Sequence, residues 1–341
     1  MTDQAIVASQ RNPTALIDLS FDHYLQRRQT QLQAHLVDGV PDYAFSLDAV
    51  LRQQLAAVGP VRALAHLLTI GVMRVQKQLQ MLNGVAVGPR QFPEIYAMGA
   101  ECAQQLGIGT PEIFIYPNLE MNASTFATDD MAPMIVLTSG LVDHFRPAEL
   151  RYVIGHECGH IHNLHGVYTT AVAALTDPLA RLLLDKLGNF GLPVNLVQMT
   201  TAIVQGGLSL FFARWSRCAE VTCDRAGLIC CGDQRAAEVA LARLGVGEGH
   251  ALENINIDEY LRQIESVQST PLRLLELTNT HPLIPKRIQA LRLFTTCAVL
   301  GEWRPELLAA GVARSKAEVD RECERFIGVW AAGYRREQAS P

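Results

Sequence analysis

The spacing of apolar residues predicts a mainly helical chain that contains one small sheet. Residues 1–90 are mainly helical in pattern, and 54–73 is an apolar stretch with Arg62 as its one charge, which is typical of a buried pair of helices. Another helix is predicted from Phe92 to Leu106, ending at Gly107. Short β-prone runs follow at 113–116, 124–127 and 134–138, and they predict a three-stranded sheet.

The segment after these runs predicts a helix that starts at Pro147. Pro147 and Glu149 are typical of a first helical turn, and Leu150, Val153 and Ile154 recur at helical spacing. Further amphipathic helices are predicted at 234–245, 257–268 and 316–336. The chain shows no repeat of fixed period, so we expect one continuous fold.

This predicted helix carries His156, Glu157 and His160 as an HExxH motif. Helical residues four apart lie on one face about one turn from each other, so both imidazoles can reach one Zn²⁺. Glu157 then lies beside the metal, where it can act as the general base toward a zinc-activated water that attacks a carbonyl group. The motif therefore indicates a peptidase site with one zinc ion per chain.

A catalytic zinc needs a third protein ligand. The longer motif HExxHxxGxxH would place Gly at position 163 and His at position 166, but the chain has Asn163 and Gly166. This difference excludes the metzincin class. His162 and His165 project from other faces of a continued helix, so we expect them to be solvated or to cap the helix.

A second helical stretch, 216–227, offers two carboxylates for the same site. Glu220 and Asp224 lie four residues apart on one helical face. One of them could bind the metal while the other accepts the free N–H of a ligating histidine. The alternative is a solvated charged helix with an ion-pair pattern formed by Arg217, Glu220 and Asp224.

Four blocks in chain order resemble the HtpX-like and CAAX-prenyl-protease-like zinc metallopeptidases, which are gluzincins. The blocks are Asn122-Ala123; Thr138-Ser139-Gly140-Leu141 with Glu149-Leu150 and Gly155-His156-Glu157-Cys158-Gly159-His160-Ile161; Arg217, Glu220, Asp224 and Gly227; and Thr280-His281-Pro282 with Arg287-Ile288. The resemblance covers about residues 90–292. Two departures are mild, because Cys158 and Cys223 replace no ligand, although Cys158 could make the site sensitive to oxidation.

The resemblance implies a role for each matched residue. It implies that His156, His160 and Glu220 hold the zinc, that Glu157 is the base and that Asp224 supports a ligating histidine. It also implies that Asn122 and Ala123 bind an extended peptide at the sheet edge, that His281 stabilises the oxyanion and that Arg287 supports the site. For His281 and Arg287 the alternatives are a turn histidine and a structural ion pair.

Composition and net charge exclude some classes of protein and argue against some binding partners. The 29 Lys+Arg and 34 Asp+Glu make 18% of 341 residues, against about 25% in an ordinary domain, while hydrophobic residues reach 49%. These values exclude a disordered chain, and a net charge of -5 argues against a nucleic-acid partner. The N-terminus lacks a signal-peptide pattern, and eight cysteines without a CxxC pair indicate buried reduced thiols. We therefore expect a cytoplasmic protein.

One segment could nevertheless contact a membrane. Residues 187–213 carry no charge, and an uncharged run of this length can cross a bilayer. The resembled family includes membrane-bound members with spanning helices at this place. Asn189, Asn195, Gln198 and Gln205 interrupt the run, and burial of side-chain amides in lipid is costly. Packed or surface-docked helices are favoured, and membrane association stays open as the alternative.

These predictions combine into an α+β, mainly helical fold in which a zincin-type helix packs on a small sheet. We expect an N-terminal helical region (1–90) that acts as a lid or prodomain, a metallopeptidase core (91–292) and a C-terminal helical extension (293–341). The expected function is a zinc-dependent endopeptidase that cleaves extended or unfolded polypeptides, with protein quality control implied by the resemblance. The alternatives are a non-catalytic zinc-stabilised peptide-binding protein and a membrane-associated prenyl-peptide processing protease.

Overall fold

The structure is a computed structural model that describes residues 22, 24–26, 35–57, 77–127, 132–166, 168, 208–247, 255–265, 276, 279–311 and 313–327. The strands are β1 (Leu36–Val37), β2 (Val40–Pro41), β3 (Val85–Ala86), β4 (Glu112–Tyr116), β5 (Ala123–Phe126) and β6 (Met134–Thr138). The helices are α2 (Ser46–Ala57), α4 (Pro93–Leu106), α5 (Ser139–His144), α6 (Pro147–His162), α10 (Leu208–Cys231), α11 (Gln234–Val246), α12 (Ile257–Glu265), α14 (Ile284–Phe294), α15 (Ala298–Trp303) and α16 (Lys316–Ile327). The predicted mainly helical fold with little sheet is confirmed.

The main sheet has four strands in the order β3-β4-β6-β5, so the predicted number of three is wrong. The additional strand, β3, pairs antiparallel with β4 through Val85 and Ala86. Two residues are too few to show a period of two, which explains why the apolar pattern does not reveal this strand. β4 and β6 are parallel, and β5 lies antiparallel to β6 at the edge of the sheet.

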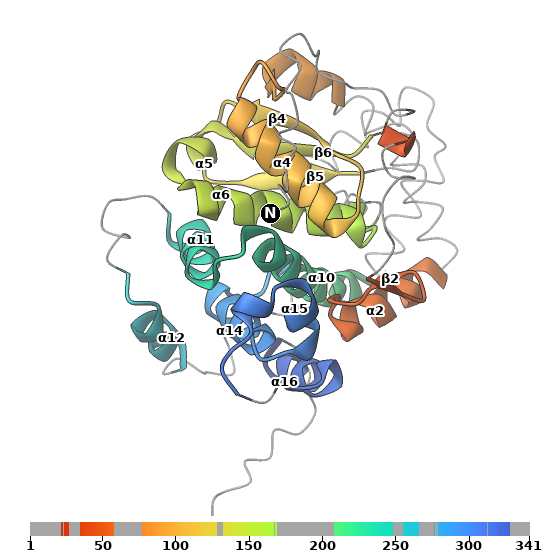
Figure 1. Ribbon diagram of the computed structural model, residues 1–341, viewed down its shortest axis with the longest axis vertical. Helices are drawn as coiled ribbons and strands as arrows, with labels where there is room; N and C mark the ends of the chain where they lie inside the picture. Colours follow the sequence, from red (N-terminus) through yellow and green to blue (C-terminus); the bar gives the residue numbers. More distant parts are fainter. Residues whose placement is uncertain are drawn as a thin grey trace, which may run out of the picture.

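The two faces of the sheet bury different side chains, as alternation along a strand requires. Ile113, Ile115, Ile135 and Leu137 join one core with residues of α4 and α6. Phe114, Met134 and Val136 form a smaller cluster on the other face. Figure 1 shows α4 and α6 against the sheet, with α10 on the far side of α6.

Helix α6 is the central element, and every residue from Tyr152 to Ile161 is buried. Its close packing on α10 depends on glycines at the crossing. A Cβ at Gly159 would lie 2.8 Å from Ala226 Cβ, and a Cβ at Gly227 would lie 2.8 Å from the Tyr152 carbonyl oxygen. These glycines let the two backbones approach closely, so side chains of α10 reach the histidines of α6.

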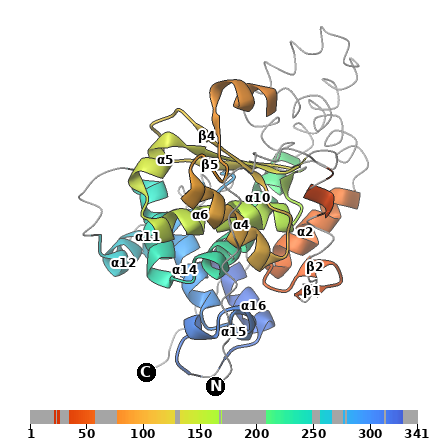
Figure 2. The same ribbon diagram turned by 45° about the horizontal axis from the view of Figure 1, so that its top comes forward.

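The N-terminal helix α2 packs on α10 and α16 and is part of the same body (Figure 2). Asp320 of α16 accepts hydrogen bonds from Ser46 Oγ at 2.6 Å and from Arg225 Nη2 of α10 at 2.7 Å. Arg225 also donates to the Tyr43 carbonyl oxygen at 3.1 Å. Three segments far apart in the sequence are therefore joined by polar contacts, and the two contacts made by Arg225 are buried.

No helix among the described residues is both long and apolar enough to span a bilayer. Most of the segment 187–213, like most of the apolar stretch 54–73 and the end of the predicted helix 316–336, lies outside the described residues. Membrane contact by residues 187–213 and a cytoplasmic location both stay predictions.

Replacing Asp320 by Asn is expected to lower the free energy of unfolding by about 2 kcal/mol at neutral pH. Burial would raise the pKa of Asp320, but Arg225 and Lys316 lower it from 3.8 to about 2. A depressed carboxyl pKa stabilises the fold above about pH 4, and this contribution is lost as the pH falls toward about 2. Urea unfolding of Asp320→Asn and wild type should therefore differ near pH 7 and converge near pH 2. An equal difference at both pH values would contradict the assignment.

Candidate metal centre and active site

The two histidines of the HExxH motif converge on one carboxylate of the neighbouring helix. His156 Nε2 lies 3.6 Å from Glu220 Oε2, and His160 Nε2 lies 3.6 Å from Glu220 Oε1. All three side chains are buried. Two imidazole nitrogens and a carboxylate oxygen are a donor set that suits zinc, so these residues fit the metal that the motif predicts.

Cys223 is a competing donor, because its Sγ lies within 4.8 Å of nitrogens of both His156 and His160. Burial, together with nearby carboxylates that include Glu220, raises the pKa of this thiol well above its ordinary value. A bound zinc ion would deprotonate such a thiol, so the positions of the donor atoms decide between the two residues. Glu220 is therefore the better third ligand, since each of its oxygens already faces one of the imidazoles.

Asp224, one turn after Glu220, holds the other side of His156. The Nδ1 of His156 donates to Asp224 Oδ1 at 3.0 Å, which leaves Nε2 unprotonated and directed at Glu220. Tyr152 OH donates to the same oxygen at 2.7 Å, and Arg287 binds Asp224 through Nε at 2.9 Å and Nη2 at 2.6 Å. Asp224 therefore fixes both the tautomer and the orientation of His156.

The charge of Glu220 is balanced by two residues near α14. Arg287 Nη1 lies 2.9 Å and His281 Nδ1 lies 3.2 Å from Glu220 Oε2. Burial alone would raise the pKa of Glu220, but the positive charges of His281 and Arg287 bring it well below its ordinary value. Glu220 in turn raises the pKa of His281, whose side chain is 66% exposed. The site thus presents an ionised carboxylate and a solvent-facing imidazole.

His165 differs from the sequence prediction, which has it solvated or capping the helix. α6 ends at His162, and Leu164 has a φ of 57°, so the chain turns back instead of continuing as a helix. His165 is 0% exposed, and its Nδ1 lies 3.2 Å from His160 Nδ1. Sequence reasoning assumed a longer helix and therefore missed this contact with a predicted ligand.

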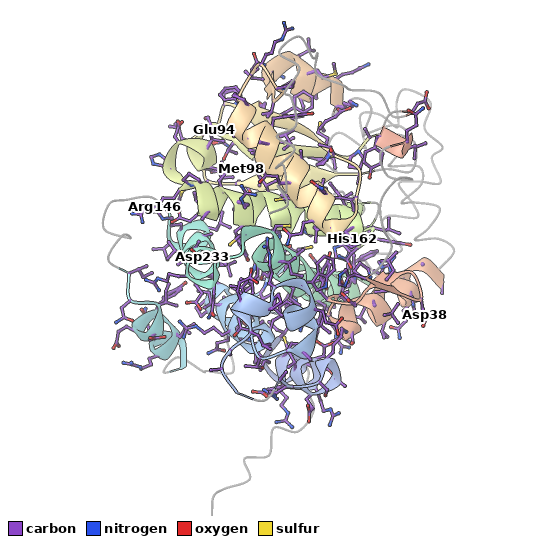
Figure 3. The ribbon with its side chains drawn as sticks, in the orientation of Figure 1. Asp38, Glu94, Met98, Arg146, His162 and Asp233 are labelled. Atoms are coloured by element: carbon purple, nitrogen blue, oxygen red, sulfur yellow. The ribbon has the colours of Figure 1, made fainter. Side chains whose placement is uncertain are left out.

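His162 lies at the end of α6 that faces the N-terminal segment, opposite the end marked by Arg146 (Figure 3). Its Nδ1 lies 2.9 Å from Tyr43 OH, and Asn163 Nδ2 donates to the same hydroxyl at 3.1 Å. His162 is half-buried, so the prediction that it is solvated is only partly correct. Its partner comes from a part of the chain that the motif analysis does not reach.

Glu157 contacts the edge strand β5. Thr125 Oγ1 lies 2.5 Å from Glu157 Oε2 and 3.1 Å from the Glu157 carbonyl oxygen. Glu157 is 6% exposed and lies on α6 between the two histidines in sequence. The hydroxyl of Thr125 holds the Glu157 side chain in one place, a contact that no motif at the sequence level indicates.

The residues predicted to bind substrate lie at the start of this edge strand. The Asn122 carbonyl oxygen accepts from Thr138 N at 3.0 Å, and Asn122 N donates to Thr138 Oγ1 at 3.0 Å. These backbone groups of Asn122 are therefore directed toward β6. Because backbone groups alternate in direction along an antiparallel pair, those of Ala123 and Thr125 are directed toward the outer edge. Within the described residues no strand pairs with that edge.

The cysteines behave as the composition predicts. All eight are free, and all but Cys231, which is half-buried, are fully buried. Burial raises the pKa of Cys158 well above its ordinary value. This speaks against the oxidation sensitivity suggested for Cys158, because oxidants react with accessible thiolates.

Comparison with known families assigns the chain. The model of peptidase family M48 matches residues 89–294, which is more than half of the chain and contains the HExxH motif, Glu220, Asp224 and Arg287. The chain belongs to peptidase family M48. This family assignment agrees with the resemblance to HtpX-like and CAAX-protease-like metallopeptidases, and it implies a metal cofactor.

Two relatives illustrate the similarity. The chain is 31% identical over 193 residues to a plastoglobule-localized metallopeptidase 48 of Arabidopsis thaliana, which covers 56% of this chain and 52% of that one. It is 27% identical over 206 residues to the protease HtpX of Pseudomonas putida, covering 56% and 68%. The chain thus spans about half the length of the plant relative.

A solved structure was also matched. The crystal structure of S. mikatae Ste24p covers 72% of this chain at 16% identity with a TM-score of 0.37. The assignment to M48 rests on the family match alone.

Proposed function

We propose that the protein is a zinc-dependent endopeptidase that hydrolyses peptide bonds. The observation that carries this proposal is the convergence of His156 Nε2 and His160 Nε2 on the Glu220 carboxylate, with Glu157 on the same helix. Three protein ligands leave a coordination position for water or substrate, as catalytic zinc sites do. The presence of Glu157 favours a catalytic function over a non-catalytic, zinc-stabilised peptide-binding protein, because a structural zinc site does not need a general base.

His156, His160 and Glu220 would hold one zinc ion per chain. When bound, zinc polarises the scissile carbonyl and lowers the pKa of a water molecule. Glu157 takes the proton from that water as it attacks and passes the proton to the leaving amine. Thr125 holds the Glu157 carboxylate during this exchange through its hydrogen bond. The partly exposed His281, with a raised pKa, would donate a hydrogen bond to the oxyanion.

An extended polypeptide is the proposed substrate. The outer edge of β5 lies beside Glu157 and offers the backbone groups of Ala123 and Thr125 to an added strand. Main-chain hydrogen bonds do not depend on side-chain identity, so such an edge accepts varied sequences. Unfolded proteins meet this requirement, and a role in protein quality control would follow from it.

The proposal is tested by metal removal. Purified protein should cleave casein, lose that activity when EDTA removes one zinc per chain, and regain it when Zn²⁺ is restored. Full activity of metal-free protein would contradict the proposal. Stoichiometric zinc without any cleavage of casein or of extended peptides would favour a non-catalytic binding protein.

A further inference from the structure

Asp48 of the N-terminal helix α2 is connected to the metal site through one intervening side chain. His165 Nε2 lies 3.0 Å from Asp48 Oδ2, and His165 Nδ1 lies 3.2 Å from His160 Nδ1. Asp48 is 1% exposed and His165 is 0% exposed. The carboxylate of Asp48, 117 residues before His165 in the sequence, is therefore connected to the predicted ligand His160 through a single imidazole.

The direction of these hydrogen bonds follows from the chemistry of each group. An ionised carboxylate only accepts, so the Nε2 of His165 carries a proton and donates to Asp48. The Nδ1 of His165 therefore acts as an acceptor, and it lies 3.2 Å from His160 Nδ1 and 3.5 Å from Cys223 Sγ. Because two unprotonated ring nitrogens at this distance would repel each other, the Nδ1 of His160 carries the proton. A proton on His160 Nδ1 leaves the lone pair on Nε2, the nitrogen that faces Glu220.

The two predicted histidine ligands are thus supported by two different acids. Asp224 holds His156 directly, from within the region matched to family M48. Asp48 holds His160 indirectly, and it lies outside that region. Ligating histidines are commonly oriented by such partners on the other ring nitrogen, and loss of the partner weakens metal affinity.

The buried carboxylate of Asp48 accepts hydrogen bonds from three side chains. Thr222 Oγ1 donates to Oδ2 at 2.7 Å, Trp215 Nε1 donates to Oδ1 at 3.0 Å, and His165 provides the third donor. Thr222 and Trp215 belong to α10, the helix that carries Glu220. The Asp48 carboxylate is therefore held in place relative to Glu220 on α10 and, through His165, relative to His160 on α6.

We propose that Asp48 and His165 are positioning residues that hold His160 in the tautomer and orientation that bind zinc. In this proposal helix α2 supports the metal centre. The sequence instead predicts that residues 1–90 act as a lid or prodomain. This inference rests on the proposed zinc site.

Asp48→Asn is the primary test, with zinc affinity measured by competition with a chromophoric chelator. An amide has one acceptor oxygen, so at least one of the three donors to Asp48 would meet an NH₂ group. With the amide oxygen at the Oδ2 position, His165 and Thr222 keep an acceptor, but a neutral amide accepts more weakly than a carboxylate. The preference of His165 for a proton on Nε2, and with it that of His160 for a proton on Nδ1, should therefore weaken. We expect zinc affinity to fall about 10- to 100-fold, and the visible spectrum of the Co²⁺-substituted protein to change.

Asp320→Asn is the matched control. It removes a buried carboxylate that also joins α2 to α10, but one that does not contact His165. It should lower thermal stability and leave both zinc affinity and the Co²⁺ spectrum at their wild-type values. Equal weakening of zinc binding in both variants would reduce Asp48 to a structural role and overturn the proposal.

Substitutions of His165 test the same connection independently. They remain informative if Asp48→Asn does not fold. His165→Leu removes both hydrogen bonds and should weaken zinc binding by the same factor. His165→Gln keeps one acceptor and one donor and should retain more of the affinity. Wild-type affinity in folded Asp48→Asn or His165→Leu would refute the inference, whereas absence of zinc from wild type would refute the proposed function itself.

Discussion

Replacing Glu157 by Gln is expected to reduce peptide cleavage by about 10²- to 10⁴-fold while one zinc ion per chain remains bound. Gln has nearly the same shape as Glu and can still accept the hydrogen bond from Thr125. It cannot take a proton from the attacking water, so only the chemical step is lost. Casein cleavage and zinc content, measured on the same preparation, separate this outcome from misfolding.

Glu149→Gln is a suitable control for this experiment. Glu149 is a buried carboxylate on the same helix, where its Oε2 accepts from Arg146 N at 3.1 Å and so caps the first turn. Its replacement should cost some stability and leave the rate of cleavage unchanged. Wild-type activity in Glu157→Gln would show that another group acts as the base.

Replacing Arg287 by Met is expected to destabilise the metal-free protein by about 3–5 kcal/mol. Arg287 is 6% exposed, and its guanidinium contacts the carboxylates of both Asp224 and Glu220. These two carboxylates lower the free energy of the charged guanidinium and raise the pKa of Arg287, although burial opposes them. Without Arg287, Glu220 would keep only His281 as a positive partner, and Asp224 would keep only its hydrogen bonds from Tyr152 and His156. Urea unfolding of the protein after EDTA treatment measures the loss.

Arg287→Lys separates charge from geometry. Lysine restores a positive charge but cannot make the two parallel hydrogen bonds to Asp224 that arginine makes. We expect a loss of stability between those of wild type and Arg287→Met. A loss below about 1 kcal/mol in Arg287→Met would instead indicate that solvent screens the carboxylates.

Local patterns predict the parts of the site that depend on one helix at a time. The i, i+4 spacing within HExxH and between Glu220 and Asp224 follows from helix geometry, so these pairs can be proposed from the sequence alone. The glycines that let α6 approach α10 are present in the same motifs, at Gly155, Gly159 and Gly227. Their packing role becomes visible only when both helices are placed.

Contacts between distant segments could not be predicted in the same way. The position of His165 depends on the end of α6 at His162 and on the left-handed backbone at Leu164, which apolar periodicity does not report. Asp48 belongs to an otherwise unremarked helix, and its role depends on how α2 packs on α10. Strand β3 is two residues long and lacks a periodic signal. In each case tertiary packing, and not local propensity, decides the outcome.

The central claim is that His156, His160 and Glu220 hold a zinc ion, and X-ray absorption at the zinc edge tests it most directly. The claim predicts nitrogen and oxygen neighbours only, at about 2.0–2.2 Å, and loss of one oxygen neighbour or of the metal in Glu220→Ala. A sulfur neighbour at about 2.3 Å would place Cys223 in the coordination sphere. That result, or zinc bound unchanged in Glu220→Ala, would contradict the claim.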